Sequence, residues 1–487
     1  MFEKPRRRRV IYNDDADQQY MGYEGYRYDI TDEQSFLDTR TTPTFSTHVD
    51  TYVWCVGNGA DPPWGVQQES KVWPCLGSHE RATDLIVEAC HVHRMEVWGS
   101  LRMNDIHDSF MVDQLEKAAE PLKAEHPEYL IAPEANRHLP QELTERYLWT
   151  AFNFARPEVR QYRLEFIERN ASAHDFDGYE LDFTRFIWDF PLGEERAKAH
   201  LMTDLVRGAR GILNTIGEMR GRPYTFAVHV PDSPRTSSEL GLDVETWLTE
   251  GLVDVLVVGM GYMPYVLPLD RWMALGGRYG VPVYPSVNTN TYAADWMRLH
   301  GRPVFHEALR ASSGYYWQEG ADGLYVFNLF CQGDKNVAGL PGEYIYAPLK
   351  EIGDPALLVG KDKLYSIQPT SDSGFCQHGS EAAPLPIALG GKEHKLPLWI
   401  GPDADDQDAT FRIRAWTSGS NDDTKLWFRL NHRLLTPTRS GNWYEAEVPA
   451  GTVRRGYNEL GVWCHADPAQ AARPVIVDRV FAPASYA

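Results

Sequence analysis

The sequence is short of positive charge and of long apolar runs. It has 48 Lys and Arg residues against 68 Asp and Glu residues, which gives a formal net charge of −20. Nucleic acids and anionic membranes are bound through clustered positive charge, so this balance excludes both as partners. The one basic cluster, Arg6–Arg9, is typical of a solvated segment that leads into a strand. No stretch reaches the roughly 18 apolar residues that a membrane span needs.

The first residues also lack the apolar core of a secretory signal, although they carry charges. If Met1 is the native start, this predicts a cytoplasmic protein. If a signal has been removed, the prediction changes to a periplasmic or secreted protein.

Cysteine is scarce, and the motifs of metal and cofactor chemistry are missing. The 6 cysteines are scattered without a CxxC pair, which predicts free and mostly buried thiols. His91 and His93 resemble a ligand pair, but side chains at positions i and i+2 of a helix point in different directions. There is no HExxH, no Gly-rich phosphate loop and no GxSxG elbow. We therefore expect no metal and no cofactor, although Asn13-Asp14-Asp15 carries ligand types that Ca²⁺ or Mg²⁺ accepts.

Residues 1–345 do contain a regular alternation of short β-like runs with amphipathic helical patterns. Such alternation is typical of α/β folds with parallel strands and here predicts a (β/α)₈ TIM barrel. Apolar stripes predict helices at Arg81–Arg94 and Glu194–Ile216, and a third that begins at Pro157. The polar residues 104–148 are predicted to form an insertion after the second barrel strand. Nine candidate strands compete for eight places, so one early segment is surplus: Arg9–Tyr12, His48–Val56, Met95–Leu101, Trp149–Asn153, Gly178–Phe183, Thr225–Val230, Val253–Gly259, Val281–Val287 and Leu324–Phe330.

After about residue 345 the pattern changes to short alternating strands separated by Gly, Pro, Asn and Asp. Strands with this spacing are typical of an antiparallel β-sandwich. The runs Leu430-Asn-His and Gly456-Tyr-Asn-Glu-Leu-Gly-Val-Trp resemble the jelly-roll modules that are often appended to barrel enzymes. We therefore predict a catalytic barrel over 1–345, a connector with short strands over 346–395, and an accessory sandwich over 396–487. The predicted sandwich strands are Thr410–Trp416, Lys425–Leu430, Trp443–Val448, Tyr457–Trp463 and Val475–Phe481.

Two acidic residues stand out on the Gly178–Phe183 strand, which we take as the fourth of the barrel. Strand alternation places Glu180 and Asp182 on the side opposite Tyr179 and Leu181. The apolar residues suit the layer under the helices, so both carboxyl groups point into the barrel. Burial and mutual repulsion then move their pKa values apart, which acid/base chemistry exploits. The competing interpretation is a buried structural ion pair with Arg185 or another cation.

Polar residues also end the other predicted strands, where the loops of a parallel barrel converge. A ring of Asn, Asp, His, Arg and Tyr suits sugar hydroxyls, which need directional donors and acceptors. For any single member, the alternative role is to cap its own loop. The predicted substrate-binding residues are Asn13, Asp14, Arg102, Asn104, Asp105, His107, Arg185, His229, Tyr262, Asn288 and Asn328.

Two segments carry a family resemblance. The run Asn153-Phe-Ala-Arg-Pro-Glu-Val-Arg and the later run Phe176-Asp-Gly-Tyr-Glu-Leu-Asp-Phe-Thr-Arg resemble the core of bacterial glycosyl-hydrolase-like barrels of type 10. The resemblance covers roughly residues 9–335. It implies that the fourth-strand carboxylates, Glu180 and Asp182, line a substrate cleft. The chitinase-type pattern D-G-x-D-x-D-x-E is also similar, but its final acid falls on Thr184, so that mechanism does not transfer.

These features together predict a glycoside hydrolase that cleaves an oligosaccharide or polysaccharide. Glycosidic cleavage needs one protonated acid and one carboxylate that attacks or activates water. We assign the second role to Asp182 and the first to Glu180 or Asp232, with Asp105 as the second choice for a partner acid after Asp232. Two alternatives remain: a carbohydrate-binding barrel without turnover, and a lyase or isomerase on the same barrel.

Overall fold

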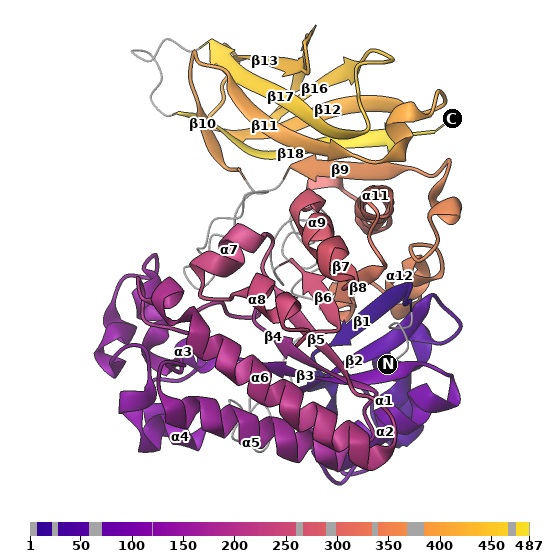
Figure 1. The fold of residues 1–487 in the computed structure, drawn as a ribbon. Coiled ribbons are helices and arrows are strands. Elements are labelled where there is room, and N and C mark those ends of the chain that lie inside the picture. The colour runs from indigo at the N-terminus through magenta and orange to yellow at the C-terminus, as the bar shows by residue number, and fades with distance from the viewer. Residues whose placement is uncertain are drawn as a thin grey trace.

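The computed structural model describes residues 7–21, 28–57, 71–118, 120–259, 266–288, 299–333, 339–367, 384–465 and 474–486. Eight parallel strands close into a barrel that is surrounded by helices (Figure 1). Two antiparallel sheets from the C-terminal part of the chain stack against each other as a sandwich beside the barrel, drawn in orange and yellow. The predicted fold class is confirmed.

The barrel strands match eight of the nine predicted segments. We had predicted that residues 104–148 follow the second barrel strand. This position is wrong, because Met95–Leu101 belongs to the third strand and residues 104–148 follow that strand. The strands are β1 Val10–Asp14, β2 Val49–Gly57, β3 Glu96–Arg102, β4 Gly178–Asp182, β5 Thr225–Val230, β6 Val255–Val258, β7 Val283–Asn288 and β8 Leu324–Phe327.

The prediction of a strand at Trp149–Asn153 is wrong. The segment contains a 3₁₀ turn at Leu148–Thr150 and a single bridge between Phe152 and Leu130. The reason is the Asn104 side chain, which accepts from the Phe152 N–H at 2.9 Å and donates to the Phe152 carbonyl at 2.9 Å. A side-chain amide therefore satisfies the backbone groups that a neighbouring strand would otherwise bind.

Local sequence signals account for the helix boundaries. Helix α2 begins after Ser78, whose side chain accepts from the Arg81 N–H, and α5 has Pro157 in its first turn. Helix α6 ends at Gly221, which adopts a left-handed φ of 71°. The helices are α1 Glu33–Arg40, α2 His79–Val92, α3 Asp108–Met111, α4 Pro121–Glu125, α5 Pro157–Ala173, α6 Glu195–Arg220, α7 Pro234–Glu239, α8 Val244–Thr249, α9 Asp270–Tyr279, α11 Phe305–Gln318 and α12 Gly342–Tyr346.

Large side chains fill the barrel interior. Trp98, Tyr284 and Tyr325 belong to one buried cluster with apolar residues from β1, β2, β5 and β6. Gly178 makes room for this packing, since a Cβ atom there would lie 2.6 Å from the Trp98 ring. The barrel is thus a packed core, and functional side chains are confined to the carboxyl ends of its strands.

The sandwich consists of a six-stranded sheet and a four-stranded sheet. The first has the order β10-β18-β12-β16-β15, with β9 paired to the other part of β18, and the second has the order β11-β17-β13-β14. Residues 346–395 therefore supply two strands, β9 and β10, to the first sheet. The bounds are β9 Lys363–Ile367, β10 Ile387–Leu389, β11 His394–Ile400, β12 Thr410–Ser418, β13 Lys425–Leu430, β14 Arg433–Leu435, β15 Thr438–Ser440, β16 Trp443–Val448, β17 Gly456–His465 and β18 Val475–Ser485.

A buried ion pair ties the sandwich to the segment that leaves the barrel. Lys363 Nζ lies 2.5 Å from Asp403 Oδ1, and both side chains are at most 3% exposed. Tyr365 and Tyr486 also donate their hydroxyl groups to this carboxylate. Lys363 donates further to the carbonyls of Leu358 and residue 361. Every charge of the cluster is hydrogen-bonded, which buried ions require.

Two further observations concern the described part of the chain. None of its helices combines the length and the apolar character that crossing a membrane requires. Its five cysteines form no disulfide with one another, and Cys376 lies outside the described residues.

We predict that Asp403→Asn lowers the free energy of unfolding by about 3–5 kcal/mol, because it leaves the Lys363 ammonium buried without a counter-charge. Denaturant unfolding followed by tryptophan fluorescence measures the effect. Lys395→Gln is the control, since Lys395 is 64% exposed in its pair with Glu459, and we expect it to leave the stability nearly unchanged. Equal effects of the two substitutions would contradict the assigned role of Asp403.

Candidate active site

The inward-facing residues at the ends of β3, β4 and β5 form two layers. In the backbone register, Ser100, Glu180 and Ala227 lie side by side, and one pleat further along so do Arg102, Asp182 and His229. Both acidic residues therefore point into the barrel, as strand alternation predicted. Glu180 belongs to the deeper layer and Asp182 to the layer nearer the carboxyl ends of the strands.

Glu180 is fully buried and its carboxyl group is hydrogen-bonded on one oxygen. Oε1 accepts from Ser100 Oγ at 2.7 Å and from the Tyr325 hydroxyl at 3.0 Å. Oε2 is buried and has no hydrogen-bond partner in the described chain. Burial, followed by the nearby charge of Asp182, raises the pKa of Glu180 to about 8. The side chain is therefore neutral at pH 7.

Asp182 is held by the backbone that follows it. Its Oδ1 accepts from the Thr184 N–H at 2.8 Å, from Thr184 Oγ1 at 2.8 Å and from the Arg185 N–H at 3.2 Å. These bonds fix the carboxylate at the start of the loop after β4. None of the described donors binds Oδ2. One oxygen of Asp182 thus orients the group, and the other binds none of the described donors.

The structure does not favour the alternative of a structural pair between Asp182 and Arg185. The Arg185 guanidinium instead donates to His107 Nε2 at 2.7 Å. Arg185 touches Asp182 through its backbone N–H.

A chain of charged groups lies beside the carboxylates. Arg102 is buried and forms ion pairs with Asp15 and with Asp105, the second at 3.2 Å. Asp105 Oδ1 also binds His107 Nδ1 at 2.6 Å. Burial alone would raise the pKa of Asp105, but His107 and Arg102 outweigh it and hold that pKa well below its usual range. Asp105 therefore stays ionised and is unsuited to donate a proton to a leaving group.

His229 is a neutral neighbour of Asp182. Its ring is fully buried, and burial lowers its pKa in spite of the Asp182 charge. Nε2 lies 2.7 Å from the Gly259 carbonyl and must donate to it. Nδ1 then carries no proton and lies 3.3 Å from Thr184 Oγ1 and 3.7 Å from Asp182 Oδ1.

Three more predicted residues lie buried at strand ends. Asn13 follows inward-facing Ile11 on β1, and its Oδ1 has no partner among the described residues. Asn328 follows β8 with a left-handed φ of 46°, a conformation that non-glycine residues rarely adopt outside constrained sites. Asp232 follows β5 and is 1% exposed, immediately before Ser233 begins α7.

Two predicted residues do not join the cleft. Asp14 points to the outer side of β1, where it pairs with Arg40 at 2.9 Å and accepts from the Tyr52 hydroxyl. Asn104 binds the backbone of residues 152 and 188 and holds the insertion to the barrel. Tyr262 lies outside the described residues, and only the backbone of Asn288 is described. Within the described ranges, no group of three His, Cys, Asp or Glu side chains is placed to hold a metal ion.

The sequence reasoning missed the two partners of Glu180. Ser100 lies two residues before Arg102 on β3 and therefore shares its inward face. Tyr325 comes from β8, at the opposite end of the barrel sequence. Alternation was a sufficient signal for Ser100, whereas the contact of Tyr325 depends on how the closed barrel is packed.

No protein-family model and no curated protein sequence matches this chain. Solved structures do resemble it in fold. An Anoxybacillus α-amylase is 14% identical over 94% of this chain and 98% of its own, with a TM-score of 0.43. An α-amylase from Geobacillus thermoleovorans, complexed with acarbose, is 11% identical over 94% and 99%, with a TM-score of 0.44. A chitinase from Bacillus thuringiensis is 11% identical over 97% and 100%, with a TM-score of 0.40. At these values the similarity carries no inference about substrate or mechanism.

The raised pKa of Glu180 predicts a pH dependence of stability. The folded state keeps the proton up to about pH 8, whereas the unfolded chain loses it near the ordinary value of 4.5. Stability contributed by this group is therefore lost as the pH rises from about 4.5 to 8. Glu180→Gln retains the acceptor for Ser100 and Tyr325 and removes the titration.

We expect the stability advantage of Glu180→Gln over the wild type to grow across this window and to level off above it. Melting temperatures between pH 5 and pH 9 measure this. Asp189→Asn is a matched control, because burial raises the pKa of Asp189 only to about 7, so its advantage should level off earlier. A constant difference between Glu180→Gln and the wild type at every pH would show that Glu180 does not titrate as described.

Proposed function

We propose that this protein is a glycoside hydrolase in which Asp182 is the nucleophile or the base that activates water. The observation that supports this most directly is the unequal treatment of two carboxyl groups on one strand. Glu180 is buried and neutral, while Asp182 is oriented through Oδ1 only. A carboxyl group that keeps its proton, on the same strand as one fixed by backbone donors, suits the division of roles in acid/base catalysis.

For the general acid we propose Asp232. Glu180 holds a proton at neutral pH, but it lies in the deeper layer, one pleat below Asp182. Asp105 is committed to Arg102 and His107. Asp232 stands at the end of β5, next to the strand that carries Asp182. Acids of a glycosidase pair commonly come from different strand ends, and this placement meets that requirement.

The remaining polar residues suit sugar recognition. Arg102, His107 and Arg185 form one hydrogen-bonded row, and Asn13, His229 and Asn328 add donors and acceptors at neighbouring strand ends. In the proposed reaction Asp182 attacks the anomeric carbon or deprotonates the attacking water. Asp232 gives its proton to the departing glycosidic oxygen. Glu180 acts as a positioning residue, because its neutral form adds no second negative charge beside Asp182.

We predict that Asp182→Asn and Asp232→Asn each lower turnover by at least about 10³-fold, since each removes a group that acts in the transition state. Release of reducing ends from a broad panel of α- and β-linked glycans measures turnover. Asp84→Asn is the control, because Asp84 is 46% exposed on α2 in a pair with His174. Wild-type turnover by Asp182→Asn on a cleaved glycan would refute the assignment.

A carbohydrate-binding barrel without turnover is the second candidate. The observation that favours it is that Asp105 is held ionised in ion pairs and cannot serve as the acid. Asp232 is then the one proposed acid. Glycan affinity without release of reducing ends by the wild type would support it. Products that absorb in the near ultraviolet would indicate a lyase instead.

A further inference from the structure

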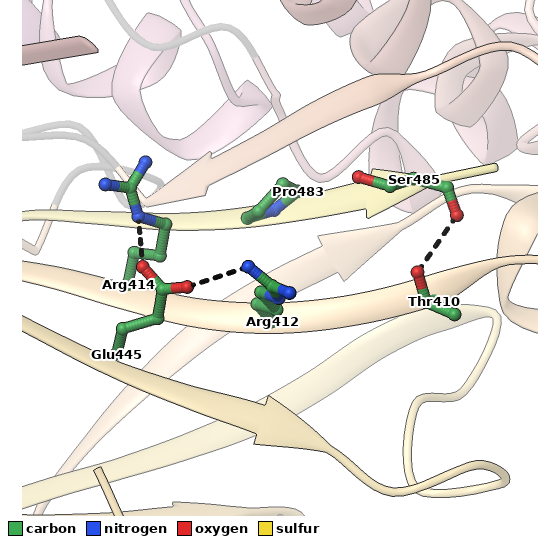
Figure 2. Close-up of a pocket in the computed structure, with 6 residues that line it drawn as sticks. All are labelled: Thr410, Arg412, Arg414, Glu445, Pro483 and Ser485. Carbon is green, nitrogen blue, oxygen red and sulfur yellow. Dashed lines mark hydrogen bonds and ion pairs between the residues drawn. The ribbon is translucent and has the colours of Figure 1, made fainter. Parts of the chain in front are cut away.

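A polar groove runs along the junction between the sandwich and the barrel. Its larger part has a volume of about 380 Å³ and is lined by the six residues drawn in Figure 2: Thr410, Arg412, Arg414, Glu445, Pro483 and Ser485. A smaller part of about 80 Å³ shares Arg414, Pro483 and Ser485 and adds His300 and Arg302 from the segment before α11, together with Lys363 and the acids Glu307 and Asp362. The larger part falls in the range of about 300–1,000 Å³ that is typical of small organic ligands.

Strand alternation directs the arginines into this groove. Phe411, Ile413 and Ala415 of β12 are in the sandwich core, so Arg412 and Arg414 project from the opposite face of the sheet. The pairing of β12 with β16 sets Glu445 directly across from Arg414. Two cations therefore stand about two residues apart along one strand, with one anion beside them on the next.

The carboxylate of Glu445 lies between the two guanidinium groups (Figure 2). Its Oε1 is 3.1 Å from Arg412 Nη1, and its Oε2 is 2.9 Å from Arg414 Nε. One carboxylate does not neutralise two guanidinium groups. Glu447, the next acid, is 87% exposed and 3.8 Å from Arg412, so water screens it. The lining of the larger part thus carries an excess of positive charge in a chain with a net charge of −20.

Arg414 is held rigidly. Its guanidinium lies 4.3 Å from the centre of the Trp443 ring, and its Nη1 is 3.4 Å from His300 Nδ1. Burial, with a smaller effect of Arg414, lowers the pKa of His300 to about 4, so this histidine is neutral and accepts from the arginine. A guanidinium fixed in this way loses little side-chain entropy on binding. With Nε beside Glu445 and Nη1 beside His300, Arg414 has the N–H groups of Nη2 left to donate to a carboxylate.

We propose that this groove binds an oligosaccharide that carries a carboxylate, that is, a uronic acid residue. Arg412 and Arg414 bind the carboxylate of the ligand. Glu445 lies between the two guanidinium groups and keeps them apart. Thr410 and Ser485 offer hydroxyl groups to the sugar, and the Pro483 ring offers an apolar surface to its C–H face. The site is separate from the barrel cleft and does not depend on the proposed hydrolase activity, because binding needs no turnover.

The test measures binding of trigalacturonate to the full chain by isothermal titration calorimetry. Maltotriose, a neutral trisaccharide, and sodium acetate, a carboxylate without a sugar, are the comparison ligands. We expect trigalacturonate to bind more tightly than both, with an affinity that falls as salt is added. Equal binding of maltotriose would refute the carboxylate requirement, and equal binding of acetate would refute the sugar requirement.

Arg412→Gln is the test variant, because Arg412 is 56% exposed and its loss leaves the packing of Arg414 on Trp443 in place. We expect it to weaken trigalacturonate binding at least about tenfold. Lys395→Gln makes the same change of charge on the other sheet and should leave the affinity unchanged. An equal loss in both variants would show a general charge effect and overturn the proposal.

Asp182→Asn separates this site from the barrel. We expect the variant to bind trigalacturonate as the wild type does, whatever its turnover. Loss of binding in Asp182→Asn together with normal binding in Arg412→Gln would place the ligand in the barrel cleft and refute the groove site. Conversely, failure of the hydrolase proposal would leave the binding of trigalacturonate in the groove unaffected.

Discussion

Two carboxyl groups on consecutive inward positions of one strand are the constraint around which the barrel is arranged. Neighbouring negative charges in a low-dielectric interior repel each other strongly, so both cannot be ionised without cost. In this structure Glu180 remains neutral, and hydroxyl groups from β3 and β8 bind one of its oxygens. Asp182 receives backbone N–H donors from the loop that follows. The two groups thereby have different surroundings although one residue separates them.

A row of charged residues lies next to these two carboxyl groups. Arg102 is enclosed between Asp15 and Asp105, and His107 connects Asp105 to the Arg185 guanidinium. Arg185 is thus drawn toward His107, and Asp182 keeps an oxygen that no described donor occupies. Arg102 is therefore paired with Asp15 and Asp105, and the Arg185 guanidinium is bound by His107.

Two groups of charged residues in the C-terminal domain differ in how deeply they are buried. Lys363 and Asp403 are enclosed and fully hydrogen-bonded, so they join parts of the fold and offer no room for a ligand. Arg412, Arg414 and Glu445 lie at an open groove with one anion for two cations. An enclosed pair contributes to stability and fixes geometry, whereas an open and unbalanced cluster retains binding capacity.

Period and alternation in the sequence determined the barrel, the sandwich and the inward direction of Glu180 and Asp182, because these depend on neighbours along one strand. They did not reveal that Trp149–Asn153 is no strand, since Asn104 takes over the backbone groups of Phe152 from 48 residues away. Nor did they show which polar residues meet: Asp14 faces Arg40, and Tyr325 reaches Glu180 across 145 positions. The tertiary structure alone decided the protonation of Glu180, because a pKa responds to burial and to charges in space.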